Sequence, residues 1–186
     1  SAAAGEGKTS VATSLAQSIA NATNEPTLLV DADLRKRNGS PLPDAESFPG
    51  LAELLTNKCS LNDAIHRLGE SNTYILPSGR EKVNLHRAVQ APPIQQLLDN
   101  LRPMFTAIVI DTPPVLSASE SLVFAKAADA VIFCSLRDVI RSRQVRAAIE
   151  RLEYTGANIL GAVLNGTSLR HYGYTYGVYA HDKEKN

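Results

Sequence analysis

The chain opens with SAAAGEGKTSVATSLAQSIANA, residues 1–22, in which a glycine-bearing loop ends in Gly-Lys-Thr and leads into an apolar pattern. Val11, Leu15, Ile19 and Ala22 recur at three- or four-residue spacing, which predicts a helix that begins directly after the loop. A phosphate loop of this kind normally follows a buried strand that aims it at the ligand. We therefore expect a strand before residue 1 and interpret the sequence as a trimmed domain or fragment.

Beyond this helix, short apolar runs typical of buried strands alternate with helical patterns. The expected strands are 27–31 (TLLVD), 73–76 (TYIL), 106–111 (TAIVID), 130–136 (AVIFCSL) and 158–164. The expected helices are 51–57, a short one capped by Ser60 with Asp63 three residues on, 94–101, 117–128 and 139–154. This alternation favours a parallel sheet covered on both faces, so we expect an α/β, doubly wound fold with a mainly parallel sheet.

Composition limits the classes of function. The chain has 186 residues, enough for one domain, with 19 basic and 19 acidic side chains, so its net charge gives no reason to expect nucleic acid as a partner. Cys59 and Cys134 fit neither a disulfide framework nor a metal-ligand spacing. No apolar run approaches the length of a membrane span, and we expect this segment to be a soluble, cytosolic one.

The loop itself is the first feature that carries chemistry. In AGEGKT, residues 4–9, glycines let successive N–H groups point at phosphate oxygens, Lys8 would reach the β- and γ-phosphates, and the Thr9 hydroxyl would bind magnesium. The strict pattern for such loops places glycine where Ala2 stands. A glycine-rich helix entry without any ligand is the alternative.

Acidic residues at strand ends favour the phosphate-binding interpretation. LLVDADLR, residues 28–35, carries Asp31 and Asp33, and IVIDTPP, residues 108–114, carries Asp111. In a parallel sheet the carboxyl ends of the strands face the ligand crevice, where a nucleotide's metal would lie. We expect these acids to converge with Lys8 and Thr9 on one crevice.

The order GEGKT, LLVDADLR, IVIDTPP and then a tyrosine-rich end resembles the bacterial tyrosine kinases (BY-kinases) of capsular and exopolysaccharide export, whose corresponding motifs are Walker A, Walker A′ and Walker B. The resemblance covers nearly the whole chain, including the PGLAELL, ILPSG and GAVLN stretches. It implies a P-loop NTPase-like fold, ATP and Mg²⁺ as cofactors, and autophosphorylation between subunits of a ring-like homo-oligomer. It also implies regulation of exopolysaccharide or capsule chain length and export, at the cytoplasmic face of the inner or plasma membrane.

Carried over residue by residue, the resemblance assigns the site. The implied catalytic residues are Lys8, Asp31 and Asp33, and the implied metal ligands are Thr9, Asp33 and Asp111. The implied nucleotide-binding residues are Ala4, Gly5, Glu6, Gly7, Lys8, Thr9, Ser10 and Asn165. Either Asp31 or Asp33 would accept or orient the tyrosine hydroxyl, and we favour Asp31 because it continues its strand directly. Asn165 resembles the position that meets the adenine edge, although a turn-forming asparagine before a glycine fits equally well.

The C-terminal end carries the second strong signal. Tyr172, Tyr174, Tyr176 and Tyr179 are four of the chain's six tyrosines and lie within eight residues. We interpret residues 169–186 as a tail of phosphoacceptors that reaches another subunit, and residues 1–168 as the P-loop kinase or ATPase domain. A structural strand of tyrosines is the alternative.

Other interpretations stay open at the level of the sequence. A MinD/ParA-like ATPase is disfavoured because Ala3 stands where such proteins carry lysine, and a nucleotide-dependent scaffold of polysaccharide assembly with little kinase activity is a third possibility. Arg35, Lys36 and Arg37 either touch a neighbouring subunit or are exposed. The expected partners are further copies of the chain and a membrane activator or chain-length protein, fused or separate.

Overall fold

The computed structural model describes residues 1–35, 45–81 and 90–167. Its strands form two hydrogen-bonded groups, a four-stranded sheet in the order β2-β3-β1-β4 and a two-stranded sheet of β5 and β6. The strands are β1 (Thr27–Asp31), β2 (His66–Arg67), β3 (Thr73–Leu76), β4 (Ala107–Asp111), β5 (Val131–Leu136) and β6 (Ile159–Asn165). β1 pairs in parallel with β3 and β4, and β5 pairs in parallel with β6, so the expected mainly parallel α/β architecture is confirmed.

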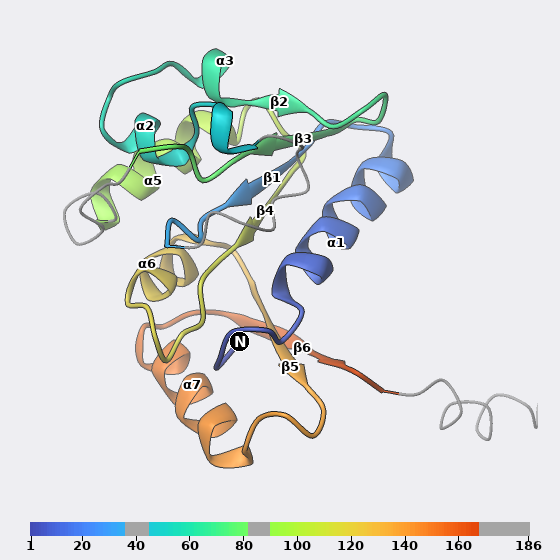
Figure 1. Ribbon diagram of the computed structural model, residues 1–186, viewed down its shortest axis with the longest axis vertical. Helices are drawn as coiled ribbons and strands as arrows, with labels where there is room; N and C mark the ends of the chain where they lie inside the picture. Colours follow the sequence, from blue (N-terminus) through green and yellow to red (C-terminus); the bar gives the residue numbers. More distant parts are fainter. Residues whose placement is uncertain (36–44, 82–89, 168–186) are drawn as a thin grey trace, which may run out of the picture.

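Helices cover both faces of the larger sheet (Figure 1). The helices are α1 (Lys8–Thr23), α2 (Leu51–Leu55), α3 (Leu61–Ala64), α5 (Ala91–Leu101), α6 (Glu120–Ala127) and α7 (Ser142–Tyr154), with a short 3₁₀ turn, η1, at Ala45–Ser47. On one face Leu29 of β1 packs with α1, whereas on the other Leu28 and Val30 pack with α2, α5 and α6. This two-sided burial explains why β1 is apolar without alternation.

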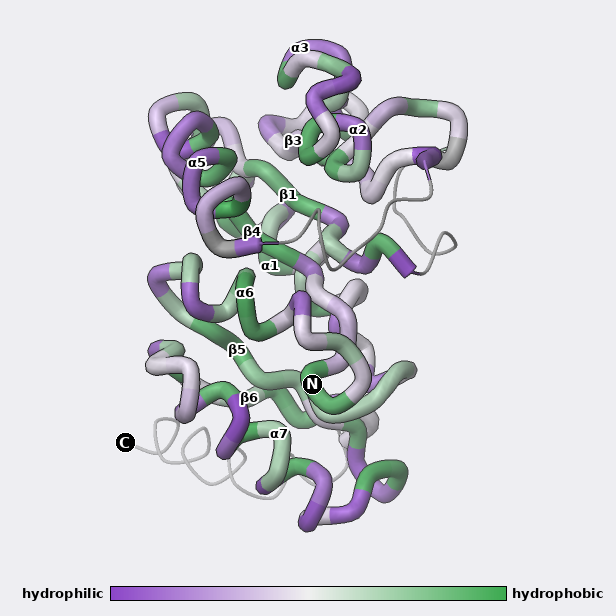
Figure 2. The backbone as a smooth tube through the Cα atoms, turned by 90° about the vertical axis from the view of Figure 1, so that its left-hand side faces the viewer, coloured by the Kyte–Doolittle hydropathy of each residue, from purple (hydrophilic) through white to green (hydrophobic). Residues whose placement is uncertain are grey.

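The smaller sheet packs against α7. Phe133 of β5 forms a cluster with Ala148 and Leu152 of α7, and the hydropathy colouring shows β5 mostly green and α7 alternating between purple and green (Figure 2). Between the two sheets lies a cavity of about 200 Å³, lined by residues of both β4 and β5. Within the described ranges no strand pairs with β4 on this side, and none pairs with β5 there.

Several element boundaries differ from those expected. α5 begins at Ala91 rather than residue 94, because prolines are tolerated in the first helical turn, where the N–H has no partner in the helix. α6 begins at Glu120 rather than 117, after a turn in which Ser117 N–H donates to the Pro114 carbonyl (3.1 Å). α7 begins at Ser142 rather than 139, because the backbone of Arg141 is extended (φ −77°, ψ 140°) and a helix cannot run through it.

β2 was missed in the sequence because two residues are too short to show a pattern, and it runs antiparallel to β3. The remaining expected helices and strands lie where the sequence placed them, to within one or two residues at most ends. No helix in the part of the chain that the structure describes is long and apolar enough to cross a membrane. Neither cysteine forms a disulfide.

Candidate active site

The glycine-bearing loop leads directly into α1. Gly7 caps the helix with a φ of 82°, a conformation that favours glycine, and a β-carbon at this position would lie 2.5 Å from Nδ2 of Asn165. The N–H groups at the start of a helix lack partners within the helix and carry the positive end of its dipole. The loop and the first turn of α1 therefore form a potential anion site.

The hydroxyl of Thr9 connects this helix to β4. Thr9 Oγ1 donates a hydrogen bond to Oδ2 of Asp111 (2.5 Å), and Asp111 is 6% exposed at the end of β4. Asp111 pairs in register with Asp31 at the end of β1. Phosphate loop, hydroxyl and two acids thus lie at one edge of the sheet.

Asp31 is surrounded by other carboxylates. Its Oδ1 accepts a hydrogen bond from the N–H of Asp33 (3.2 Å), and its side chain is also hydrogen-bonded to Ser78 at the end of β3. Burial, and then the nearby charges of Asp111 and Asp33, raise the pKa of Asp31 to about 7, although both hydrogen bonds act in the opposite direction. A cation at this edge would relieve that repulsion.

Lys8 and Glu6 shape the loop from within. Lys8 Nζ lies 3.5 Å from the Ala3 carbonyl oxygen. Glu6 is fully buried, and its Oε2 accepts a hydrogen bond from the Ala3 N–H (2.6 Å) while its Oε1 has no partner among the described residues. These contacts fold residues 3–8 into a compact turn.

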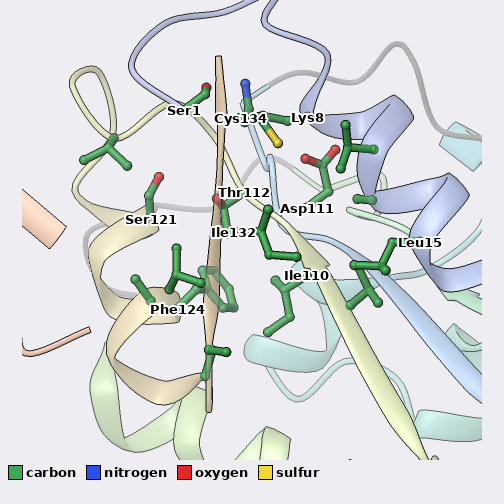
Figure 3. Close-up of a pocket in the computed structure, with 18 of the residues that line it drawn as sticks. Ser1, Lys8, Leu15, Ile110, Asp111, Thr112, Ser121, Phe124, Ile132 and Cys134 are labelled. Atoms are coloured by element: carbon green, nitrogen blue, oxygen red, sulfur yellow. The ribbon is translucent and has the colours of Figure 1, made fainter. Parts of the chain in front are cut away.

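The cavity between the sheets adjoins this edge of the sheet. Lys8 and Asp111 lie at one end of it, but most of its lining is apolar and includes Leu15, Ile110 and Phe124 (Figure 3). Such a lining does not suit a polyphosphate, which needs donors and cations. The cavity lies beneath the candidate site.

Asn165 at the end of β6 meets the loop. Its Nδ2 donates a hydrogen bond to the Glu6 carbonyl oxygen (2.7 Å). The side chain therefore supports the backbone of the phosphate loop, a contact that neither sequence interpretation of Asn165 included. Gly166 follows it with a φ of 74°, in keeping with a turn at this point.

The structure brings together most of the residues that the sequence singled out. Thr9, Asp31, Asp33 and Asp111 form one connected group, and Lys8 lies in the same loop and helix start. Ala4, Gly5 and Ser10 are exposed beside it. The roles of all these residues in binding and catalysis remain predictions. The tail, with Tyr172, Tyr174, Tyr176 and Tyr179, lies outside the described residues.

Two neighbours of the site complete its surroundings: Ser78, to which the sequence assigned no role, and Arg35, which was expected either to touch a neighbouring subunit or to be exposed. Ser78 belongs to ILPSG, which gave a resemblance but no chemistry. Arg35 donates to both carboxylate oxygens of Glu120 (2.7 and 3.0 Å) and to the Ser117 carbonyl (3.3 Å), so it is tied to α6 within its own chain. Glu120 is buried, whereas Arg35 is about half exposed. Lys36 and Arg37 lie outside the described residues.

Comparisons with known proteins decide the family. A family profile described as an AAA domain matches residues 2–149. The tyrosine-protein kinase CpsD of Streptococcus agalactiae serotype Ia is 32% identical over 165 residues, covering 88% of this chain and 71% of CpsD. The tyrosine-protein kinase Etk of Escherichia coli K12 is 30% identical over 164 residues, covering 88% of this chain and 22% of Etk. This chain belongs to the bacterial tyrosine kinase family.

Structural similarity agrees with this family. The solved kinase domain of Escherichia coli Etk matches with a TM-score of 0.81 and 29% identity, covering 89% of this chain and 65% of that one. The septum site-determining protein MinD of Pyrococcus horikoshii, solved with Mg-ADP, matches with a TM-score of 0.67 at 23% identity, covering 90% of this chain and 69% of that one. The likeness to MinD shows a shared fold, whereas the tyrosine kinases share both fold and sequence.

Proposed function

We propose that this domain is an ATP-dependent protein-tyrosine kinase that phosphorylates, in trans, tyrosines on other copies of the same chain. The contact between Thr9 Oγ1 and Asp111 carries the proposal, because it joins the first turn of α1 to the end of β4, beside Asp31. Phosphoryl transfer needs charge neutralisation and an oriented hydroxyl, and this edge of the sheet supplies groups for both. The family of the chain favours tyrosine as the acceptor.

The donors at this edge fit Mg²⁺. Mg²⁺ is held by one or two carboxylates together with waters and phosphate oxygens, so it does not need a closed cage of protein ligands. The described residues contain no group of three or more His, Cys, Asp or Glu side chains that could hold a metal by themselves. We assign Thr9, Asp111 and Asp33 to the ion, which when bound would neutralise charge on the phosphates.

The remaining groups divide the work of binding and orientation. The backbone of residues 4–7 and the start of α1 at Lys8–Ser10 would bind the phosphates, with Asn165 supporting the loop through Glu6. Lys8 would neutralise charge on the β- and γ-phosphates. Asp31, which continues β1 directly, would orient or accept the proton of the tyrosine hydroxyl.

Incubation of the protein with Mg-ATP, followed by anti-phosphotyrosine detection and mass spectrometry, tests this function. We expect phosphotyrosine that depends on Mg²⁺ and is absent from the Lys8→Met variant. Nucleotide-dependent assembly without phosphotyrosine would favour the scaffold or the MinD-like ATPase instead.

We also propose that Tyr172, Tyr174, Tyr176 and Tyr179 are the acceptors. Each phosphotyrosine adds about −1.5 to −2 charges, so four would place roughly −6 to −8 on one short segment. Repulsion between such tails would loosen a ring of subunits. Phosphate found elsewhere, with residues 172–179 unmodified, would refute the acceptor assignment. An oligomer size that light scattering finds unchanged after phosphorylation would refute the loosening of the ring.

The extent of the domain is a further part of the proposal. We infer that residues 1–168 form the P-loop domain, completed by a parallel strand that occupies the cavity between β4 and β5 and leads into the loop. The apolar lining supports this, as do the facing edges of β4 and β5, with which no strand of the described ranges pairs. The partners we propose are further copies of the chain and a membrane activator or chain-length protein of exopolysaccharide export, at the cytoplasmic face of the membrane.

A further inference from the structure

A buried carboxylate on α2 holds the loop that follows β3. Glu53 is 3% exposed, and its oxygens accept hydrogen bonds from the N–H groups of Gly50 (2.8 Å), Arg80 (3.1 Å) and Glu81 (2.8 Å). Three N–H donors compensate a carboxylate for the loss of water. Glu53 therefore fixes the far end of the loop against the start of α2.

The near end of the same loop is held by backbone contacts. The N–H groups of Leu51 and Ala52, in the first turn of α2, donate to the carbonyls of Pro77 (2.8 Å) and Ser78 (3.0 Å). Between the two ends, Gly79 has a φ of 94°, and a β-carbon there would lie 2.1 Å from Oε2 of Glu53. We call residues 77–81 with the start of α2 the β3–α2 clasp.

The β3–α2 clasp places one hydroxyl against the candidate site. β3 lies beside β1, with Leu76 in register with Val30, so the residues after β3 reach the end of β1. Ser78 is 8% exposed, and its hydroxyl is hydrogen-bonded to Asp31. Asp31 is thus held by the N–H of Asp33 from its own loop and by Ser78 from the neighbouring strand.

We propose that Ser78 is a positioning residue, which fixes the Asp31 carboxylate for the incoming tyrosine hydroxyl. Ser78 is itself held in place by the β3–α2 clasp. This inference rests on the proposed kinase function of Asp31. A carboxylate that receives an O–H on one side has its remaining lone pairs directed, whereas an untethered one samples several side-chain conformations. Ser78 acts on Asp31 from the β3 side of β1, whereas the phosphate loop contacts Asp111 on the β4 side. Its loss should therefore leave ATP binding intact.

Kinetics of Ser78→Ala and Ser78→Thr test the role. We expect Ser78→Ala to lower kcat for tyrosine phosphorylation roughly tenfold or more, as misplacement of a reacting group does, with KM for ATP within about twofold of wild type. Ser78→Thr keeps the hydroxyl and should restore most of kcat. The matched control is Ser71→Ala at the other end of β3, which removes a hydroxyl bonded to Leu68 O (2.8 Å) and Thr73 N (3.2 Å). A parallel change in kcat and KM, or equal effects of Ser78→Ala and Ser71→Ala, would overturn the proposal.

Crystal structures of the same variants supply a readout that needs no kinase activity. We expect the Asp31 carboxylate to move in Ser78→Ala and to stay in place in Ser71→Ala and Ser78→Thr. An unmoved Asp31 in Ser78→Ala overturns the positioning role whether or not the wild type transfers phosphate. A displaced Asp31 in a protein that makes no phosphotyrosine supports the positioning contact and defeats only the proposed function. Ser78→Cys, similar in volume but a weaker donor, replaces Ser78→Ala if that variant does not fold.

Discussion

β1 and β6 are both parallel strands that end at the candidate site, yet they contribute to it in different ways. β1 has a neighbour on each edge and helices on each face, and its first four residues are buried. β6 pairs with β5, and Leu160 and Leu164 on it are 72% and 54% exposed. Asp31 thus stands at the end of the buried strand, whereas the exposed strand supplies a single amide, that of Asn165, to the phosphate loop.

The first test separates the chemistry of the site from the packing that supports it. Lys8→Met removes a half-buried charge that belongs to no apolar cluster, so we expect phosphotyrosine formation to fall by about 10²-fold or more at an unchanged melting temperature. Anti-phosphotyrosine signal and calorimetry measure the two quantities. Lys126→Met, at an exposed position of α6, should retain activity. Wild-type activity in Lys8→Met would remove Lys8 from the site.

The second test compares the two strands directly by the same substitution. Leu28→Ala in β1 deletes a fully buried side chain and should lower the free energy of unfolding by about 2–5 kcal/mol. Leu160→Ala in β6 deletes an exposed one and should change it by no more than about 0.5 kcal/mol. Urea denaturation measures both. Similar losses would mean that a partner in solution covers β6.

The third test measures, in the absence of metal, how Asp31 on the buried strand β1 makes the stability of the fold depend on pH. Because the pKa of Asp31 is raised from 3.8 to about 7 by folding, the folded chain holds its proton more tightly, and stability is lost as pH rises from about 4 to 7. Asp31→Asn removes this loss and should raise the melting temperature at pH 8 in EDTA by roughly 2–4 °C, the shift that about 1 kcal/mol gives in a domain of this size. At pH 4 the two proteins should melt together. A destabilised Asp31→Asn at pH 8 would contradict the assignment.

The smallest expected effect belongs to the exposed strand. Asn165→Ala removes one hydrogen bond to the loop, so we expect about 0.5–1.5 kcal/mol less stability and a comparable weakening of Mg-ADP binding. Asn158→Ala is the control, because Asn158 Nδ2 donates to the Asp129 carbonyl (3.0 Å) at the far end of β6. Calorimetric titration should separate the two variants. Equal nucleotide affinity in both would leave Asn165 without a part in the site.

The sequence was informative where a pattern is local. Asp31 and Asp111 follow uninterrupted apolar runs, so their position at strand ends, and hence on one edge, could be predicted. Ser78 and Glu53 could not, because the contact of α2 with the loop after β3 depends on how distant segments pack. The ion pair of Arg35 with Glu120 joins residues 85 positions apart and was missed for the same reason.

The β3–α2 clasp bears on how tolerance to mutation should be interpreted in this chain. A β-carbon at Gly79 would strain the backbone, since its φ is positive, and would push Oε2 of Glu53 out of the clasp. Every replacement that one base change can produce at a glycine codon adds that carbon. In a saturation screen scored by activity, Gly79 would therefore be as intolerant as Lys8, although it lies in the clasp and not in the phosphate loop. Ranking positions by intolerance alone would place part of the catalytic centre in the wrong loop, and only a parallel screen for protein abundance would tell the two apart.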